Sequence, residues 1–360
     1  MTYNLKNFNL KQNELIPVDE LIQKILYTPK VGYYSKKNPF GIQGDFVTAP
    51  TISNLFSEII TIWIVSAWEK LGKPKKFNLV ELGPGDGSFA KVLSRTLKKF
   101  PILEKKTNIF LYEKSDLLIK TQKKKLKGSK IKWIKNFNKV KRGPVIFFGN
   151  EFFDAIPIKQ FLYEKETLFE KYYSIDFFNS DFKKVYKKAN DKDIKRIKLF
   201  RSLKGIKFIE FPKLGLIEMD EIVKKINNLS GGILLIDYGY LNLSNKSTLQ
   251  AVMKNKKINL DLFFKNLGNA DITSLVNFNL LKEYFVKKNL KVKNIVSQKF
   301  FLEKMGIIER ANILQRKMNL KQKNHMFLTL RRLLHKDLMG ELFKVIFAFK
   351  SKNNNFLGFN

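Results

Sequence analysis

The chain has 360 residues, no cysteine, and a formal net charge of +36 at pH 7. The lack of cysteine excludes disulfides, cysteine nucleophiles and thiolate zinc sites. Only two histidines, His325 and His335, are present, and no nucleophile-elbow motif accompanies them, which argues against a serine hydrolase. The sequence therefore predicts no metal site. Its longest apolar run, residues 59–68, is too short to span a bilayer and predicts a buried helix.

The positive charge has two interpretations. The chain has 68 Lys and Arg residues but only 32 Asp and Glu residues, and this excess of positive charge is compatible with a nucleic-acid partner. Lysine, asparagine, isoleucine and phenylalanine are over-used together, however, and the lysines are dispersed, which favours a bias of composition. No RNA-binding signature with interleaved aromatic residues and glycines occurs. A nucleic-acid partner is therefore not expected, but the charge leaves it open.

The first 75 residues predict helices on either side of a long loop. Residues 14–30 predict a helix that ends near Pro29, and residues 53–71 predict a second helix. The loop between them, "VGYYSKKNPFGIQGDFVTAP", has no steady period, and its aromatic residues indicate an ordered, functional segment. Near the N-terminus lies Glu14, with no arginine-rich amphipathic stretch or apolar signal core, so a cytoplasmic, bacterial-type protein is expected.

From residue 76 onward, strands and helices alternate. Strands are predicted at residues 77–82, 108–113, 131–134 and 144–149, and helices at 87–100 and 115–127. This rhythm predicts the α/β class, with a Rossmann-like, doubly wound parallel sheet and helices on both faces. The apolar strand "GGILLIDYG" resumes the sheet at 231–239. After it we expect a loop at 240–272, a helix at 274–289, a strand near 291–296, helices around 301–338 and a last strand in "ELFKVIFAFK".

Residues 158–230 interrupt this alternation. A hairpin turning at Lys165–Glu166, a basic helix and the short strand "KFIEFP" predict an inserted α+β cap subdomain. The expected organisation is an N-terminal helical segment in 1–75, a core in 76–157 and 231–350, the insertion in 158–230, and a frayed tail in 351–360.

Acidic residues follow the predicted strands, although basic residues outnumber acidic ones two to one. The first strand ends in "ELGPGDG" at 81–87, the second in Glu113, the fourth in "GNEFFDAIP" at 149–157, and the fifth in Asp237. Ligands bind at the carboxyl ends of parallel strands. We therefore expect these acids to lie around one site.

Their spacing favours one class of nucleotide. The Gly-Lys-Ser/Thr sequence of a P-loop is absent, and acids at a glycine turn would repel the pyrophosphate of a dinucleotide. S-adenosylmethionine has a ribose and positive charge but no phosphate, while its carboxylate suits the helix N–H groups near Ser88. Glu113, 26 positions beyond Gly87, has the spacing of a ribose ligand. The predicted cofactor-binding residues of this motif are Glu81, Gly83, Gly85, Asp86, Gly87 and Glu113.

The segment after the fourth strand provides the candidate acceptor site. Glu151 and Asp154 either begin a helix, with Asp154 stabilising its dipole, or form a pair of carboxylates that orients a cationic acceptor. An arginine guanidinium, with five donors and a pKa above about 12, suits such a pair. Either carboxylate could take the proton as the methyl group is transferred. The neighbouring Phe152–Phe153 pair is interpreted as packing rather than as a stacking platform.

Taken together, these segments resemble the MidA-type, mitochondrial complex I assembly methyltransferases. The blocks that carry the resemblance are "GYYSKKNPFGIQGDFVTAPTIS", "LVELGPGDGS", "LYEKSDLLIKTQ", "NEFFDAIPIKQF", "LLIDYG", "STLQAV", "ADITSLVNF" and "MGELFKVI", within residues 15–348. The resemblance implies a class I fold with a mostly parallel seven-stranded sheet, and S-adenosylmethionine as cofactor. It also implies methylation of a protein arginine, in eukaryotic relatives in a subunit of NADH dehydrogenase (complex I).

The resemblance further implies roles for individual residues. The loop at 41–48 would close over the cofactor, with contacts from Gly44, Asp45 and Thr48. The residues that would face the methyl donor and acceptor are Asn150, Glu151 and Asp154.

The sequence departs from the family pattern at a few positions. Thr51 replaces a usual glutamate, Lys171 an arginine, and Leu275 and Asn277 lie where a histidine and an aspartate are usual. These departures bear on the acceptor and on catalysis, not on the cofactor. Two other functions stay open: a non-catalytic factor that binds a complex I partner, and an RNA methyltransferase or RNA-binding protein, which the acidic site disfavours. A homodimer is also left open.

Overall fold

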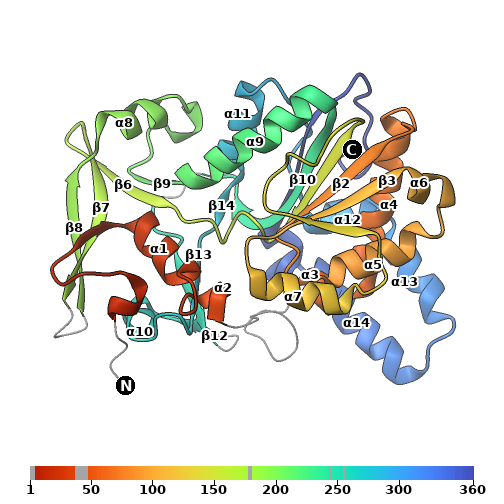
Figure 1. Ribbon diagram of the computed structural model, residues 1–360, viewed down its shortest axis with the longest axis horizontal. Helices are drawn as coiled ribbons and strands as arrows, with labels where there is room; N and C mark the ends of the chain where they lie inside the picture. The colour runs from red at the N-terminus through yellow and green to blue at the C-terminus, as the bar shows by residue number, and fades with distance from the viewer. Residues whose placement is uncertain (1–4, 37–47, 177–180, 243–244, 254–255) are drawn as a thin grey trace. The chain divides into compact units, whose positions relative to one another are not determined.

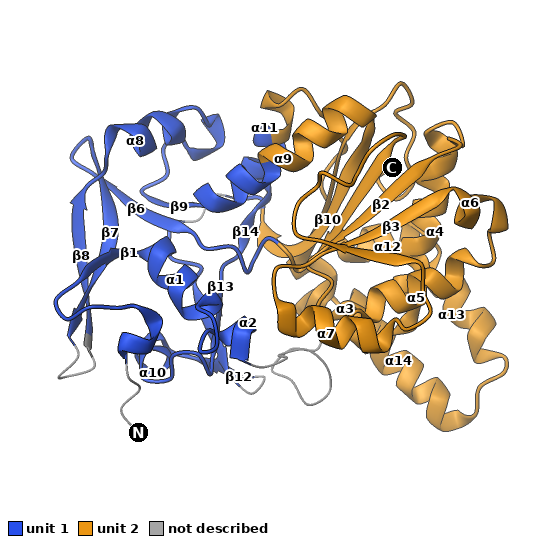
Figure 2. Ribbon diagram, viewed as in Figure 1, with its two compact units in different colours: residues 1–46, 153–219, 241–284 blue, residues 47–152, 220–240, 285–360 orange. Residues whose placement is uncertain are grey.

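The computed structural model of the protein describes residues 5–36, 48–176, 181–242, 245–253 and 256–360 (Figure 1). The chain divides into two compact units (Figure 2). Unit 1 consists of residues 1–46, 153–219 and 241–284, and unit 2 of residues 47–152, 220–240 and 285–360. This division differs from the expected segments, because residues 1–46 and 241–284 join most of the insertion and residues 47–75 join the sheet.

Unit 2 is built on the expected α/β sheet. Its strands are β2 (Phe77–Leu82), β3 (Thr107–Tyr112), β4 (Ile131–Ile134), β5 (Val145–Asn150), β10 (Gly231–Tyr240), β15 (Lys291–Val292), β16 (Val296–Ser297) and β17 (Phe343–Lys350). Along the described residues the order is β15-β17-β10-β5-β2-β3-β4, with β16 also paired to β17. The five strands from β10 to β4 are parallel, and β17 runs antiparallel to β10. The predicted mostly parallel sheet is confirmed.

Helices cover this sheet and complete the core of unit 2. They are α3 (Ala49–Ile52), α4 (Asn54–Lys70), α5 (Ser88–Leu97), α6 (Pro101–Lys106), α7 (Asp116–Lys125), α12 (Gln298–Lys304), α13 (Ile307–Gln315) and α14 (Leu320–Leu334). The predicted buried helix is α4, whose Ile60, Trp63 and Ile64 lie in the main hydrophobic core. In the part of the chain that the structure describes, no helix is long and apolar enough to cross a membrane.

Unit 1 combines two small antiparallel sheets with short helices. One sheet has the order β1-β7-β6-β9, with β8 on the far side of β7, and the other has the order β12-β11-β13. The strands of these sheets are β1 (Leu15–Pro17), β6 (Lys159–Glu164), β7 (Thr167–Asp176), β8 (Asp181–Lys188), β9 (Phe208–Phe211), β11 (Gln250–Met253), β12 (Lys256–Ile258) and β13 (Asp271–Thr273). The short strand β14 (Val276–Asn277) belongs to neither of the two. The helices are α1 (Val18–Tyr27), α2 (Tyr33–Lys36), α8 (Asp191–Lys198) and α10 (Leu260–Phe264), while α9 (Lys213–Leu229) and α11 (Phe278–Lys287) cross the unit boundary.

The predicted hairpin of the insertion is confirmed. Glu164 lies opposite Thr167, so the turn consists of Lys165 and Glu166. Both have positive φ, 44° and 61°, as a two-residue turn that follows the twist of its strands requires.

Several predicted elements are wrong at their boundaries. Residues 14–30 begin with strand β1, because Leu15 and Ile16 pair with Ser174 and Tyr173 of β7, and the helix starts only at Val18. The expected loop at 240–272 contains the strands β11 and β12 and the helix α10. The expected loop at 31–50 contains α2, and α3 begins within it. The insertion also contains β8 and α9, which were not expected. Residues 37–47 lie outside the described part. Short strands that pair with distant segments leave no local period in the sequence.

The expected frayed tail is wrong as well. Phe356 and Phe359 are 1% and 3% exposed and belong to the core of unit 2. The ring of Phe356 meets that of Phe347 with 4.8 Å between centroids, and the indole N–H of Trp63 donates to the carbonyl of Leu357 at 3.1 Å. Two aromatic side chains therefore anchor an otherwise polar end of the chain.

We expect the Phe356→Ala variant to lower the free energy of unfolding by about 3–5 kcal/mol, because it removes a fully buried ring. Leu357→Ala is the matched control: its side chain is exposed, and its carbonyl still accepts from Trp63. Urea denaturation of both variants measures the difference. Equal stability of the two would contradict the packed tail.

Candidate active site

The carboxyl ends of four parallel strands of unit 2 lie side by side. Leu82 of β2 lies opposite Tyr112 of β3 and Gly149 of β5, and Asn150 of β5 lies opposite Ile236 of β10. The acidic residues that end or follow these strands therefore emerge at one edge of the sheet, where parallel sheets bind ligands.

The turn from β2 into α5 is shaped by its glycines. Gly83 and Gly85 have φ of 58° and 55°, in the left-handed region that favours glycine. A Cβ added at Gly83 would lie 3.0 Å from the ring of Phe152, so this position also has no room for a side chain. The Gly83 N–H donates to the carbonyl of Tyr112 at 3.1 Å, which ties the turn to the next strand. Phe152 thus packs on the turn.

Glu81 carries a buried carboxyl group beside this turn. Its Oε2 is buried without a hydrogen-bond partner among the described residues. Burial raises the pKa of Glu81 well above its usual value, and the nearby carboxylates of Asp86 and Glu113 raise it further. A ligand cation would relieve this penalty. The buried acid and the glycine turn together fit a cationic nucleoside such as S-adenosylmethionine.

Glu113 is oriented by two donors at the end of β3. Its Oε1 accepts from the N–H of Ser115 at 2.8 Å and its Oε2 from Nε2 of Gln122 at 3.2 Å. Burial raises the pKa of Glu113, while these hydrogen bonds act in the opposite direction. The carboxyl group is therefore held in one orientation.

Gln122 links the two halves of the site and escaped the sequence analysis. Its buried Nε2 also donates to the carbonyl of Gly85 at 2.8 Å, and its Oε1 accepts from the indole of Trp133 at 2.9 Å. It therefore joins the glycine turn to Glu113. The only sequence signal for it is its place in the block "LYEKSDLLIKTQ", because an isolated glutamine on a helix indicates no chemistry.

Asp86 has a different environment from Glu81. Its Oδ2 accepts from Nζ of Lys125 at 2.6 Å, and its Oδ1 accepts from the N–H of Ser88 in the first turn of α5 at 2.9 Å. Lys125 also donates to the hydroxyl of Ser88 at 2.6 Å. Gly87, with φ of 81°, precedes the helix as its N-cap. Asp86 is therefore paired and helps to start α5, and its contact with a cofactor stays a prediction.

The residues assigned to the loop over the cofactor are only partly described. Gly44 and Asp45 lie outside the described residues. Thr48 precedes α3, and its carbonyl accepts from the hydroxyl of Thr51 at 2.8 Å. The threonine found where the family usually has glutamate thus stabilises the first turn of α3.

Asn150 and Glu151 form a hydrogen-bonded pair at the end of β5. Nδ2 of Asn150 donates to Oε1 of Glu151 at 3.0 Å, and the N–H of Glu151 donates to the carbonyl of Ile236 at 2.9 Å. Glu151 has a φ of 51°, which is uncommon for a residue with a side chain. Such conformations persist where the surroundings require them, and they cluster at functional sites. The strand edge and the Asn150 amide therefore fix the Glu151 carboxylate.

Asp154 belongs to unit 1 and is buried there. Residues 151–158 form turns and bends, so the interpretation of Asp154 as the start of a helix is wrong. The N–H of Ser274 donates to the main-chain carbonyl of Asp154 at 3.2 Å. Its role toward an acceptor stays a prediction.

The other departures from the family pattern have partners of their own in unit 1. The N–H of Leu275 donates to the hydroxyl of Thr248 at 3.0 Å, and Oδ1 of Asn277 accepts from the N–H of Leu280 at 3.0 Å, which caps α11. Lys171 is buried and donates to Oε1 of Gln160 at 2.9 Å. Burial lowers the pKa of Lys171 to about 8.

Glu81→Gln is expected to make the ligand-free protein more stable at high pH and to weaken cofactor binding. In the unfolded chain the pKa of Glu81 is near 4.5, and in the folded protein it is higher, so the folded state binds the proton more tightly. Stability is therefore lost as pH rises from about 4.5 through the raised pKa. Glutamine does not titrate, so the free energy of unfolding of the variant, relative to wild type, increases across this pH range.

Urea denaturation at pH 5 and pH 8 and calorimetric titration with S-adenosylmethionine measure these effects. The exposed Glu104→Gln change on α6 is the control for the loss of a carboxylate. A stability difference that is the same at both pH values would rule out Glu81 as the titrating group.

Gln122→Ala should lower both the stability and the cofactor affinity, because it removes donors to Gly85 and Glu113 and leaves buried acceptors unpaired. We expect a loss of about 1–3 kcal/mol in the free energy of unfolding. Thr121→Ala, one residue earlier on the exposed side of α7, should change it by less than about 0.5 kcal/mol. Denaturation and calorimetry check this, and unchanged affinity in Gln122→Ala would show that Gln122 does not position the turn.

Comparisons with known proteins agree with this geometry. The family model described as "Putative S-adenosyl-L-methionine-dependent methyltransferase" matches residues 59–296. "Protein arginine methyltransferase NDUFAF7, mitochondrial" from Xenopus laevis is 28% identical over 365 residues, which cover 94% of this chain and 82% of the relative. The Caenorhabditis elegans homolog is 28% identical over 86% of this chain and 78% of the relative, and the human protein 27% identical over 87% and 75%.

A solved structure shows the same fold. The Burkholderia thailandensis protein crystallised with S-adenosyl-homocysteine has a TM-score of 0.77 at 22% sequence identity, covering 96% of this chain and 90% of that chain. The predicted class I methyltransferase fold is therefore confirmed.

The names of the relatives also correct one expectation. From the sequence we expect a cytoplasmic protein, but the Xenopus, Caenorhabditis and human relatives are all named mitochondrial.

The predicted cofactor follows from the family model itself. That model spans more than half of the 360-residue chain and includes the glycine turn, Glu113 and the Asn150–Glu151 pair. The chain therefore belongs to this family of S-adenosyl-L-methionine-dependent methyltransferases.

Proposed function

We propose that the protein transfers a methyl group from S-adenosylmethionine to an arginine of a protein substrate. The curated relatives are named protein arginine methyltransferases, and that name supports the acceptor. The observation that carries the proposal is the Glu151 carboxylate, held by Asn150 on a left-handed backbone at the end of β5. Strand β5 is hydrogen-bonded to β2, which leads into the glycine turn.

In this proposal the acids divide the binding of the cofactor among them. Glu81 faces positive charge, because its buried Oε2 has no donor among the described residues. Glu113 accepts from the ribose hydroxyls, since each carboxylate oxygen has a second lone pair beside the one used by Ser115 or Gln122. The glycine turn lets the backbone approach the ligand. Gly44, Asp45 and Thr48 would complete the site from the loop at 41–48.

Glu151 acts on the acceptor. Bound S-adenosylmethionine supplies an electrophilic methyl group on a sulfonium sulfur. The Glu151 carboxylate accepts N–H bonds from the planar guanidinium and so orients one nitrogen for attack. It then takes the proton that this nitrogen releases as it is methylated. Asn150 keeps the carboxylate in place, and Asp154 would be a second acceptor for the guanidinium.

The acceptor protein is proposed to be a subunit of NADH dehydrogenase, as the resemblance to complex I assembly methyltransferases implies. Tritiated S-adenosylmethionine, added with the purified protein to a lysate of a strain that lacks it, locates the acceptor. Hydrolysis of the labelled protein should release methylarginine. Label that appears in RNA instead would refute the proposal.

Glu151→Gln should lower the methylation rate at least about 100-fold with little change in cofactor affinity. The change removes the proton acceptor but keeps the size and shape of the side chain. The exposed Glu164→Gln variant at the end of β6 is the control. Single-turnover rates and calorimetric titration separate the two effects.

If the Glu151→Ala/Asp154→Ala variant still supports complex I assembly in cells, the protein acts there as a binding factor rather than as a catalyst.

A further inference from the structure

The segment 316–336, which includes α14, is basic. It contains no Asp or Glu, and it holds both histidines of the chain. Its basic residues, all exposed, are Arg316, Lys317, Lys321, Lys323, Arg331, Arg332 and Lys336. Glu58, on α4 of the same unit, is paired with Arg95 and Arg310.

The same helix exposes large apolar side chains. Leu320, Phe327 and Leu328 are 75%, 62% and 58% exposed, while Met326 and Leu333 on the opposite side of α14 are buried. Leu320 and Phe327 are seven residues apart and therefore share one stripe of the helix. We call the exposed side of α14, with its apolar and basic residues, the α14 face.

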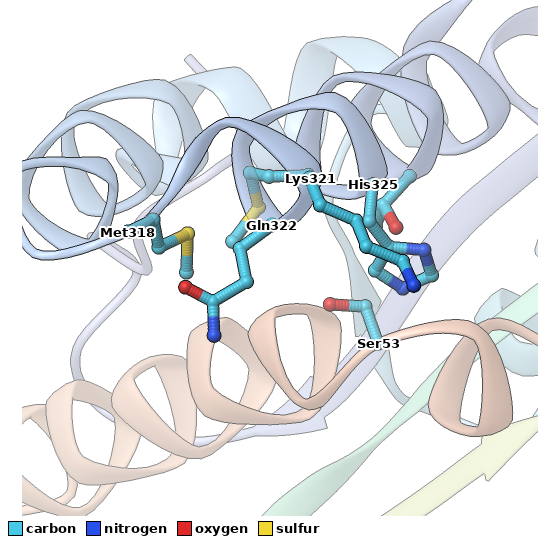
Figure 3. A pocket seen from close by; sticks show the side chains of 7 residues that line it. Ser53, Met318, Lys321, Gln322 and His325 are labelled. Carbon is cyan, nitrogen blue, oxygen red and sulfur yellow. The ribbon is translucent and has the colours of Figure 1, made fainter.

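A pocket lies next to the α14 face, between α14 and the start of α4. Its volume is about 320 Å³ and its wall is mostly apolar, with Met318 and Met326 among the residues that line it. Lys321, His325 and Ser53 come together on one side of the pocket, and Met318 lies on the other (Figure 3). The pocket thus combines an apolar interior with the Lys321 cation at its edge.

We propose that the α14 face docks on the surface of an anionic lipid bilayer. Lysine and arginine near a membrane are attracted to anionic headgroups, and exposed leucine and phenylalanine insert at the headgroup–acyl boundary. The methionine-lined pocket fits an aliphatic chain, with Lys321 beside the headgroup phosphate.

Two other occupants fit the α14 face less well. RNA would be bound by the cations but would gain nothing from burying Leu320 and Leu328, which have no π-system on which bases stack. A second copy in a two-fold dimer would bring the same seven basic residues of both chains together, with no acid in the segment to compensate them. An anionic bilayer satisfies both the charge and the apolar side chains.

Co-sedimentation of the full chain with vesicles tests the proposal. Vesicles of phosphatidylcholine with phosphatidylglycerol should bind it at least about tenfold more tightly than vesicles of phosphatidylcholine alone, and added salt should weaken binding. Phe327→Ser combined with Lys323→Gln should lower the partition coefficient at least about fivefold. The matched control, Ile102→Ser with Lys105→Gln on α6, removes the same chemistry from another exposed helix of unit 2 and should bind as wild type does.

The fold of both double variants is checked by thermal unfolding and by binding of S-adenosylmethionine, neither of which should change. Failure of the wild type to bind anionic vesicles at low salt would overturn the proposal, as would equal binding by the Phe327→Ser/Lys323→Gln variant. So would a wild-type dimer in light scattering that this variant converts to a monomer. Tight binding of single-stranded RNA that depends on the same residues, without vesicle binding, would assign the α14 face to nucleic acid instead.

Discussion

A buried carboxyl oxygen with no hydrogen-bond partner among the described residues is the constraint on which the candidate site depends. Glu81 emerges from the centre of a parallel sheet, where desolvation and two neighbouring acids oppose its ionisation. The ligand-free fold gains nothing from this charge, whereas a cationic ligand gains an attraction in surroundings of low dielectric constant. A protein that keeps such a group sacrifices stability for binding, a compromise common at functional sites.

The surroundings of the other acids make Glu81 distinctive. Lys125 neutralises Asp86 and holds it at the start of α5, and Gln122 and the Ser115 N–H hold Glu113. Gln122 also donates to the carbonyl of Gly85, so one side chain connects the glycine turn to the acid of the next strand. Three acids that look alike in the sequence therefore have three different environments: Asp86 is paired with a lysine, Glu113 is held by two donors, and Glu81 has a buried oxygen with no partner among the described residues.

Charge is distributed in opposite ways at the site and on the surface. The chain carries 36 more basic than acidic residues, yet the strand ends of unit 2 are acidic. Because net charge is a sum over the whole chain, it did not indicate the ligand of the site. The local distribution is more informative: the α14 face, with its basic residues and exposed Phe327, is chemically distinct from the acidic edge of the sheet.

Much of the sheet of unit 2 and the glycine turn of the candidate site could be predicted from the sequence, because buried strands and the glycines before α5 are local patterns. The Lys165–Glu166 turn could also be predicted, because the conformation of a two-residue turn depends on those two residues. Tertiary structure alone decided that Leu15 and Ile16 form a strand against β7, that Phe356 anchors the tail, and that Gln122 joins two loops. It also decided the left-handed backbone of Glu151. Each of these depends on contacts between segments far apart in the chain, which no local period records.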